Sequence, residues 1–155
     1  FSSPYLQIDA TYLVPAGSSI RNVADADQRG VRIAVSDKSV EDIVLSGMLK
    51  GAELRRVKTV GAGFELLQAG NADVLAVPRP TAVRFSAQKP GFRVLEDRFH
   101  ATFGAMAVPK GQSGLLAYLN EFVEEAKASG LVQGAIERAG VRGVQVAPAG
   151  KPPNR

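Results

Sequence analysis

The sequence predicts an α/β protein built around a mixed, mainly parallel sheet with flanking helices. Residues 31–35 and 73–77 are short, largely apolar runs, as expected of strands that helices cover on both faces. Each run is followed by a polar turn and then by a helical pattern, over residues 39–50 and 81–88. Strand and helix units that succeed one another in this way indicate a parallel sheet.

Apolar runs bounded by Gly and Pro define the remaining strands. Pro15 and Gly17 end the first of them, and Pro109 and Gly111 end the last. Residues 54–57 carry exposed charges, so we expect them near an edge of the sheet. In chain order the predicted strands are residues 10–14, 31–35, 54–57, 73–77, 92–95 and 102–108.

Helical spacing and capping residues define the helices. Asn22 is the predicted cap of a short helix that Gly30 ends, and Ser113 is the predicted cap of the clearest amphipathic helix in the chain. The predicted helices are residues 23–28, 39–50, 62–69, 81–88, 113–129 and 131–139. The apolar stripe of the helix at 39–50 is Val40, Ile43, Val44 and Met48. That of the helix at 113–129 is Leu115, Leu116, Leu119, Phe122, Val123 and Ala126.

Composition limits the kinds of function. The chain has 155 residues, 45% of them hydrophobic and 22% charged, which suits one or two small lobes with a packed core. The net charge of +4 is dispersed along the chain, so we expect no nucleic-acid partner. With no cysteine and one histidine, the chain offers neither a thiolate nucleophile nor a zinc cluster, and we predict no metal and no cofactor. No apolar run approaches the roughly 20 residues of a membrane span.

Two polar turns are the first places to look for a ligand. Ligands of open α/β sheets lie outside the carboxyl ends of the strands, which here are the turns at residues 36–39 and 78–81. Hydroxyl groups and the N–H groups of a helix N-terminus hold anions, and a nearby cation strengthens them. We therefore predict that the ligand-binding residues are Ser36, Lys38, Ser39, Arg79 and Thr81.

Several of these side chains also have a purely structural interpretation. Ser39 is the best candidate for the cap of its helix, and capping alone would explain it. Lys38 is also explained as an exposed loop lysine. Arg79 lies between two prolines that restrict its backbone, and a ligand-facing and a surface position both remain open. Asp73 is predicted to be a structural turn residue. His100 has no partner at recognisable spacing, so we predict no catalytic residue and no enzyme activity.

Several short segments follow one another in a recognisable order over residues 1–145. They are Phe1-Ser-Ser-Pro-Tyr5, Tyr12-Leu-Val14, Val23-Ala-Asp25 with Gly30-Val-Arg-Ile-Ala-Val35, Gly70-Asn-Ala-Asp73, Pro109-Lys-Gly111 and residues 122–130. No single motif is specific, but in their order and spacing these segments resemble those of one protein family, the family 3 bacterial extracellular solute-binding proteins, which are the amino-acid-type periplasmic receptors of ABC transporters.

The resemblance implies a two-lobed protein of the type II periplasmic-binding-protein fold, in which two crossing strands join the lobes. It assigns residues 1–10 to the end of lobe 1 and the first crossing, residues 11–101 to lobe 2, and residues 102–145 to the second crossing and the C-terminal helices of lobe 1. Residues 146–155 are expected to be a disordered tail, because they are rich in Pro and Gly.

Most of lobe 1, including the arginine with which the family holds the ligand carboxylate, is expected to be missing. Because residue 1 is not Met, we expect either that a signal peptide and more have been removed or that the sequence is part of a longer protein. The helix at 113–129 would then lack its cover on lobe 1. We expect the chain alone to self-associate through this helix or to fold it back onto lobe 2, and to bind solute poorly in both cases.

Two departures from the family pattern concern the ligand. The family commonly has Gly-Thr or Gly-Ser in the turn after the lobe 2 strand, where this chain has Lys38 and Ser39. The family's aspartate for the ligand ammonium corresponds to Pro78, and Arg79 follows it. The resemblance therefore implies a small polar or anionic solute, amino-acid-like or an organic acid, in preference to a cationic amino acid.

The leading interpretation is a periplasmic protein that captures this solute between two lobes and delivers it to the permease of an ABC transporter in the membrane. Two alternatives stay open. A periplasmic dehydratase of the same fold would need a catalytic carboxylate in the cleft, and we find none placed for that role. A ligand-sensing domain of a receptor kinase or transcription regulator would be joined to membrane or DNA-binding sequence.

Overall fold

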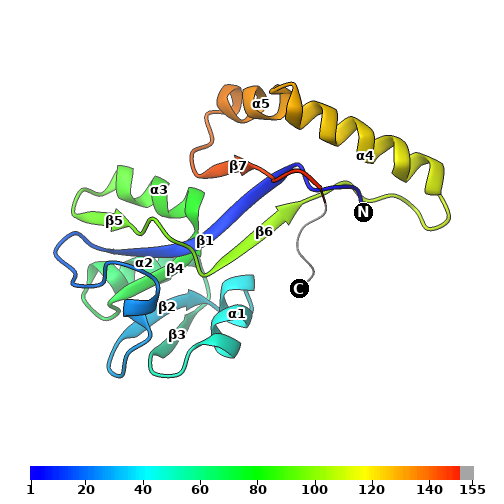
Figure 1. The fold of residues 1–155 in the computed structure, drawn as a ribbon. Helices are drawn as coiled ribbons and strands as arrows, with labels where there is room; N and C mark the ends of the chain where they lie inside the picture. Colours follow the sequence, from blue (N-terminus) through cyan, green and yellow to red (C-terminus); the bar gives the residue numbers. More distant parts are fainter. Residues whose placement is uncertain (151–155) are drawn as a thin grey trace. The chain divides into compact units, whose positions relative to one another are not determined.

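The structure, a computed structural model, describes residues 1–150 (Figure 1). These residues form two compact units. Unit 2 is Asp9–His100, and unit 1 joins Phe1–Ile8 to the chain from Ala101 onward. The chain passes from unit 1 into unit 2 along β1 (Leu6–Pro15) and returns along β6 (His100–Gly104).

Unit 2 contains a mixed sheet with the strand order β3-β2-β4-β1-β5. Its further strands are β2 (Arg32–Ser36), β3 (Glu53–Val57), β4 (Val74–Pro78) and β5 (Phe92–Val94). Strand β2 runs parallel to β3 and β4, whereas β1 runs antiparallel to β4 and β5. The predicted α/β fold is confirmed, and β3 lies at the edge of this order, as its charges predicted.

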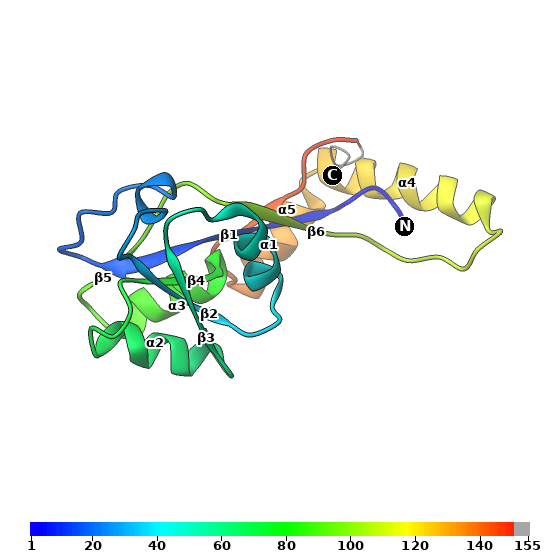
Figure 2. The ribbon, with the colours of Figure 1, turned by 90° about the horizontal axis from the view of Figure 1, so that it is seen from below.

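Helices follow each of the parallel strands and cover the two faces of the sheet (Figures 1 and 2). They are α1 (Val40–Met48), α2 (Val60–Gln68) and α3 (Arg79–Gln88). Because successive strand residues point to opposite faces, Tyr12 and Val14 join the core that contains Leu45 of α1, and Leu13 joins the core that contains Phe64 of α2.

The second of these cores is closely packed. Phe64 stacks on Phe85 of α3 with ring centroids 4.3 Å apart, and Phe92 meets the same ring edge-on. Gly63 lets α2 approach the sheet, since a Cβ at this position would lie 2.8 Å from Cδ1 of Leu75. The helices α2 and α3 are thereby packed against β4, and α3 begins directly after the carboxyl end of that strand.

Unit 1 is built on the start of β1, residues 6–8. Strand β6 and the short β7 (Val144–Val146) both pair with β1, with Leu6 opposite Val146. Two helices, α4 (Ser113–Ala128) and α5 (Leu131–Ala139), pack on one another, and Gly130 between them adopts a φ of 79°. This left-handed conformation is the one that glycine supplies at the end of a helix.

Three predictions about helices are wrong in detail. The helix predicted at 23–28 is a single 3-10 turn, Ala24–Ala26, because the carboxylate of Asp27 turns back to accept from the backbone N–H groups of residues 50–52. Ser113 does not cap α4, whose N-cap residue is Gln112 and has no side-chain cap. Most of the stripe predicted to bury α1 is exposed, with Ile43 at 68%, and only Val44 of the stripe is half-buried.

The orientation of α1 has a clear cause. Its buried residues are Asp42 and Leu45, one turn apart. The carboxylate of Asp42 points toward β3, where it accepts a 2.9 Å hydrogen bond from Nε of Arg56. This pair fixes the face of α1 that meets the sheet, and Leu45 follows it into the core. Val40 and Met48 consequently lie on the exposed side.

The expectation of a disordered tail from residue 146 does not hold for its first residues. Val146 ends β7, and Ala147 is buried and donates from its backbone N–H to Tyr5 O at 3.1 Å. Backbone pairing with β1 orders this part of the chain in spite of its composition. The rest of the predicted tail, from residue 151, lies outside the described residues.

Candidate functional site

The strand register brings the two predicted turns together at one edge of the unit 2 sheet, namely the edge formed by the carboxyl ends of its parallel strands. Ile33 of β2 lies beside Val74 of β4, so the parallel strands end side by side, at Ser36 and Pro78. The antiparallel β1 reaches the same edge, where Ala10 is paired with Pro78. The helices α1 and α3 both begin here, and their N-termini carry partial positive charge.

The turn between β2 and α1 has an unusual backbone. Lys38 has a φ of 59°, and among the described residues it is the only non-glycine residue with a positive φ. A left-handed conformation is strained for a residue with a side chain and is natural for glycine. Lys38 occupies the position where the resembling family commonly has Gly, so the turn keeps a glycine-like conformation with a lysine in it.

Ser39 is the N-cap of α1, as predicted. Its Oγ accepts a 3.2 Å hydrogen bond from the backbone N–H of Asp42. The carboxylate of Asp42 in turn accepts from the N–H of Lys38 at 3.0 Å and from Oγ of Ser46 at 3.1 Å. Burial raises the pKa of Asp42, but these hydrogen bonds together with Arg56 outweigh it and hold the pKa below its usual range. The carboxylate is therefore ionised, and Arg56 offsets its charge.

Two backbone donors remain at the start of α1. Within the described chain, the N–H groups of Val40 and Glu41 have no acceptor, as is usual for the first turn of a helix. The half-buried Ser36 ends the strand that leads into this turn, and the exposed Lys38 adds a positive charge. An anion placed here would meet two amides, hydroxyl groups and an ammonium group.

The second turn is arranged differently. Pro78 precedes α3 and Pro80 lies in its first turn, while Thr81 is half-buried beside them. The side chain of Arg79 is only 16% exposed, and its guanidinium donates hydrogen bonds to backbone carbonyls of residues 95–97. The donors of Arg79 are thus largely engaged within unit 2, whereas the role of Thr81 as a ligand residue stays a prediction.

Sequence reasoning did not find the partners of Arg79. Its Nε lies 3.9 Å from Oδ2 of Asp9, a buried carboxylate whose Oδ1 is 3.4 Å from Nη1 of Arg98. Asp9 and Arg98 are 89 positions apart in the sequence. No local pattern links residues so far apart, and only the pairing of β1 with β4 brings Asp9 beside the turn.

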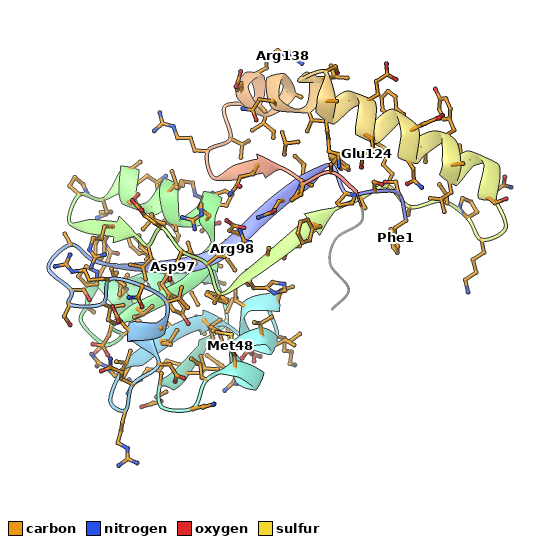
Figure 3. All side chains as sticks on the ribbon, in the orientation of Figure 1. Phe1, Met48, Asp97, Arg98, Glu124 and Arg138 are labelled. Carbon is orange, nitrogen blue, oxygen red and sulfur yellow. The ribbon has the colours of Figure 1, made fainter. Side chains whose placement is uncertain are left out.

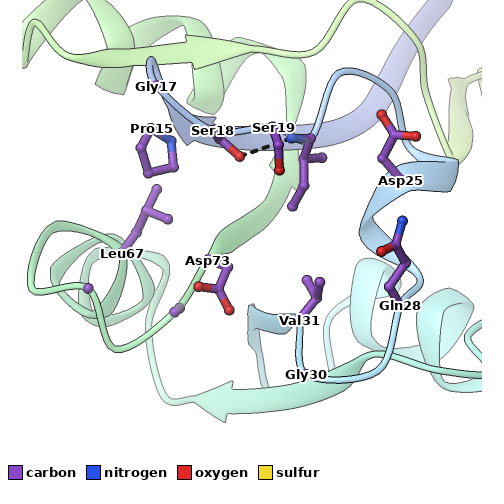
Figure 4. A pocket seen from close by; sticks show the side chains of 13 residues that line it. Pro15, Gly17, Ser18, Ser19, Asp25, Gln28, Gly30, Val31, Leu67 and Asp73 are labelled. Carbon is purple, nitrogen blue, oxygen red and sulfur yellow. Dashed lines mark hydrogen bonds between the residues drawn. The ribbon is translucent and has the colours of Figure 1, made fainter.

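A hollow of about 750 Å³ lies at the opposite edge of the sheet, where the parallel strands β2 and β4 begin (Figure 4). Ser18 and Ser19 lie on one side of it, and Asp73 lies on the other. The carboxylate of Asp73 is paired with Arg32 at 2.9 Å, and this hydrogen bond is the main reason that the pKa of Asp73 is lowered. Asp73 thus has the contacts of a structural turn residue, and neither predicted ligand turn contributes to this hollow.

Residues 1–150 contain no group of His, Asp and Glu that could hold a metal ion. His100 starts β6, and its Nε2 is buried and has no hydrogen-bond partner among the described residues. In the same part of the chain, no helix is both long and apolar enough to cross a membrane.

No protein-family profile and no curated protein sequence match the chain, but solved structures do. A mutant of ArgBP from T. maritima matches with 28% sequence identity and a TM-score of 0.66, over 89% of this chain and 60% of its own. The substrate-binding protein of an amino acid ABC transporter matches with 25% identity and a TM-score of 0.65, over 89% of this chain and 62% of its own. The protein AbpA from Streptococcus pneumoniae, bound to L-arginine, matches with 21% identity and a TM-score of 0.67, over 90% and 60%.

The chain has the type II periplasmic-binding-protein fold. The resemblance to the family 3 solute-binding proteins is confirmed as a structural match to the amino acid binding proteins of ABC transporters. The chain spans about 60% of the length of these structures. The assignment of its residues to two lobes stays a prediction.

Proposed function

We propose that the chain is part of a periplasmic solute-binding component of an ABC transporter, and that unit 2 supplies one wall of its solute site. The observation that carries the proposal is the turn between β2 and α1. There, unpaired backbone N–H groups of Val40 and Glu41 lie next to the hydroxyl of Ser39 and the charge of Lys38. Binding at this turn needs only hydrogen bonds and charge, without covalent chemistry.

The charges at this edge favour an anionic or neutral solute. An α-ammonium group would need a carboxylate, yet the position where the resembling family has aspartate is Pro78. The buried carboxylate of Asp9, beside the Pro78 turn, already lies between Arg98 and Arg79, and that of Asp42 is paired with Arg56. AbpA is described as bound to L-arginine, so this chain would differ from it in solute charge. We therefore propose a small organic acid or an acidic or neutral amino-acid-like molecule.

Transport is a better account than catalysis at this edge. A dehydratase would need a carboxylate that exchanges a proton with its substrate. The carboxylate of Asp9 already lies between the guanidinium groups of Arg98 and Arg79, and Asp42 is held ionised on the sheet side of α1. In the proposed role, the protein with its bound solute meets a membrane permease. The other contacts to the solute would come from a part of the protein that corresponds to the portion of the solved structures that this chain does not span.

The proposal is tested by calorimetric titration of the complete gene product with L-glutamate, L-glutamine and L-lysine. We expect binding of L-glutamate or L-glutamine and none of L-lysine. Lys38→Gly should weaken L-glutamate by about tenfold or more, because it removes a charged donor and keeps the turn. Lys89→Ala, which removes an exposed lysine after α3, is the matched control and should leave the affinity unchanged. Tight binding of lysine or arginine would contradict the proposal.

A further inference from the structure

The guanidinium of Arg79 is bonded to a chain segment of unit 2. Its Nη1 donates to Leu95 O at 2.8 Å, and its Nη2 donates to Glu96 O at 2.9 Å and to Asp97 O at 3.0 Å. Three consecutive carbonyl groups therefore accept hydrogen bonds from one side chain. The planar fork of arginine suits such an arrangement, whereas a lysine ammonium is a point charge without it.

Thr11 of β1 holds the same segment from another side. This residue is fully buried, and its Oγ1 lies 2.7 Å from Asp97 O and 3.1 Å from Leu95 O. Backbone bonds extend the attachment, since Leu95 N–H donates to Tyr12 O and Phe99 N–H donates to Ala10 O, both at 3.0 Å. Residues 95–99 are thus fastened to β1 along their length, and Arg79 adds the link to the start of α3.

This segment is where the chain leaves unit 2. Asp9 is the first residue of the unit, and Arg98, labelled with Asp97 in Figure 3, lies two residues before its last residue, His100. The carboxylate of Asp9 lies 3.4 Å from Arg98 and 3.9 Å from Arg79. Both ends of unit 2 are therefore tied to each other and to the turn that begins α3.

We propose that Arg79 is a positioning residue, which fixes both exits of unit 2 against the start of α3, and that it does not contact the solute itself. The exits are the places where a change of the angle between two lobes would have to be absorbed. Resting on the proposed function, the inference adds that the turn carrying Thr81 and the exits of unit 2 move together, because Arg79 joins them. A solute bound at this edge would thus act on the exits through Arg79.

The test is amide hydrogen exchange of the protein without solute, in the variants Arg79→Lys and Arg79→Met. We expect the amides of Leu95 and Phe99 to exchange about tenfold faster or more in both variants, because local opening of this segment becomes easier. Amides between β2 and β3, such as that of Arg56, should be unchanged. Arg84→Met is the control, since Arg84 lies on the same helix and its guanidinium carbon is 5.4 Å from the centroid of the Phe85 ring, with no hydrogen bond or ion pair to residues 95–99 among the described residues.

Two results would overturn the inference. One is unchanged exchange at Leu95 and Phe99, and the other is an equal increase across all of unit 2, which would make Arg79 a contributor to overall stability only. Thr11→Val, which keeps the shape of a buried residue and removes its donor, is a second variant with the same expectation. Because no solute is present, the result stands even where the titrations described above show no solute binding, so the two failures are distinguishable.

Discussion

The backbone N–H of Lys38 donates a 3.0 Å hydrogen bond to the carboxylate of Asp42, while the N–H of Asp42 donates to the hydroxyl of Ser39. The two bonds close the start of α1 reciprocally, in the manner of a capping box shifted by one residue. They hold Lys38 in its left-handed conformation, with a φ of 59°. The backbone strain at Lys38 thus lies next to the amides of the proposed solute site.

Lys38→Gly should make the protein more stable. A side chain in the left-handed region costs about 1–2 kcal/mol, and glycine removes this cost. Glycine also has more freedom in the unfolded chain, which destabilises the folded protein by about 0.5–1 kcal/mol and offsets part of the gain. We expect a net increase of about 0.5–1 kcal/mol in the free energy of unfolding, measured by urea denaturation. A less stable Lys38→Gly variant would show that the lysine side chain makes stabilising contacts.

Asp42→Asn should make the protein less stable at neutral pH. The amide cannot accept from Lys38 N–H, Ser46 and Arg56 as the carboxylate does, and Arg56 loses its counter-charge. Because Arg56 is 45% exposed and water screens its charge, we expect a loss of about 1–3 kcal/mol in the free energy of unfolding. Glu41→Gln, in the same turn, is the control and should change stability much less.

The same variant changes the pH dependence of stability. The pKa of Asp42 is lower in the folded protein than the usual value, so its contribution is present above the unfolded pKa and is lost as the pH falls through the folded one. We expect the stability difference between the wild-type protein and Asp42→Asn to shrink as the pH falls below about 4. A difference that stays constant down to pH 2 or so would mean that the ionised carboxylate is not what stabilises the turn.

Tyr12→Phe should leave the protein equally stable or make it more stable. The hydroxyl of Tyr12 is buried and has no hydrogen-bond partner among the described residues. The centroid of the Tyr12 ring lies 4.9 Å from that of the Phe99 ring. Burial, and then the nearby carboxylates of Asp27 and Asp97, raise the pKa of this hydroxyl. Removing an unpaired hydroxyl avoids a desolvation cost of about 1–3 kcal/mol. A destabilisation beyond that of Tyr118→Phe, an exposed control, would contradict this expectation.

An apolar groove of about 410 Å³ in unit 1 supports the expected self-association. Phe122 and Ala126 of α4 line it together with Leu131 and Ile136 of α5. Along α4 the apolar surface continues through Tyr118, which is 64% exposed. The exposed apolar surface of α4 thus adjoins the groove. Because burying each large apolar side chain is worth about 1.5–3 kcal/mol, we expect a second copy of the chain to cover the groove together with this surface.

Light scattering of the 155-residue chain should therefore show a mass that rises with concentration above that of the monomer. Phe122→Asp, at a side chain that is 42% exposed, should return the protein to a monomer. Val40→Asp, at a similarly exposed apolar position in unit 2, is the matched control and should not. A monodisperse monomer at every concentration would show that the groove is not a contact between copies.

The parts of the structure that follow from local pattern were predictable. The runs at 31–35 and 73–77 became β2 and β4, and Ser39 became a cap, because alternation, helical period and capping act between near neighbours. The face of α1 was not predictable, since it depends on the pairing of Asp42 with Arg56 on another strand. The contacts of Arg79 with residues 95–97 depend on the whole sheet.

The most direct test of the solute site is a titration of the complete gene product followed by amide NMR. Adding L-glutamate should shift the amide signals of Ser39, Val40 and Glu41 in a saturable way, and L-lysine at the same concentration should leave them unchanged. Shifts confined to the hollow near Ser18 and Asp73, or no shift at the start of α1 with any of these solutes, would contradict the proposal that this turn binds the solute.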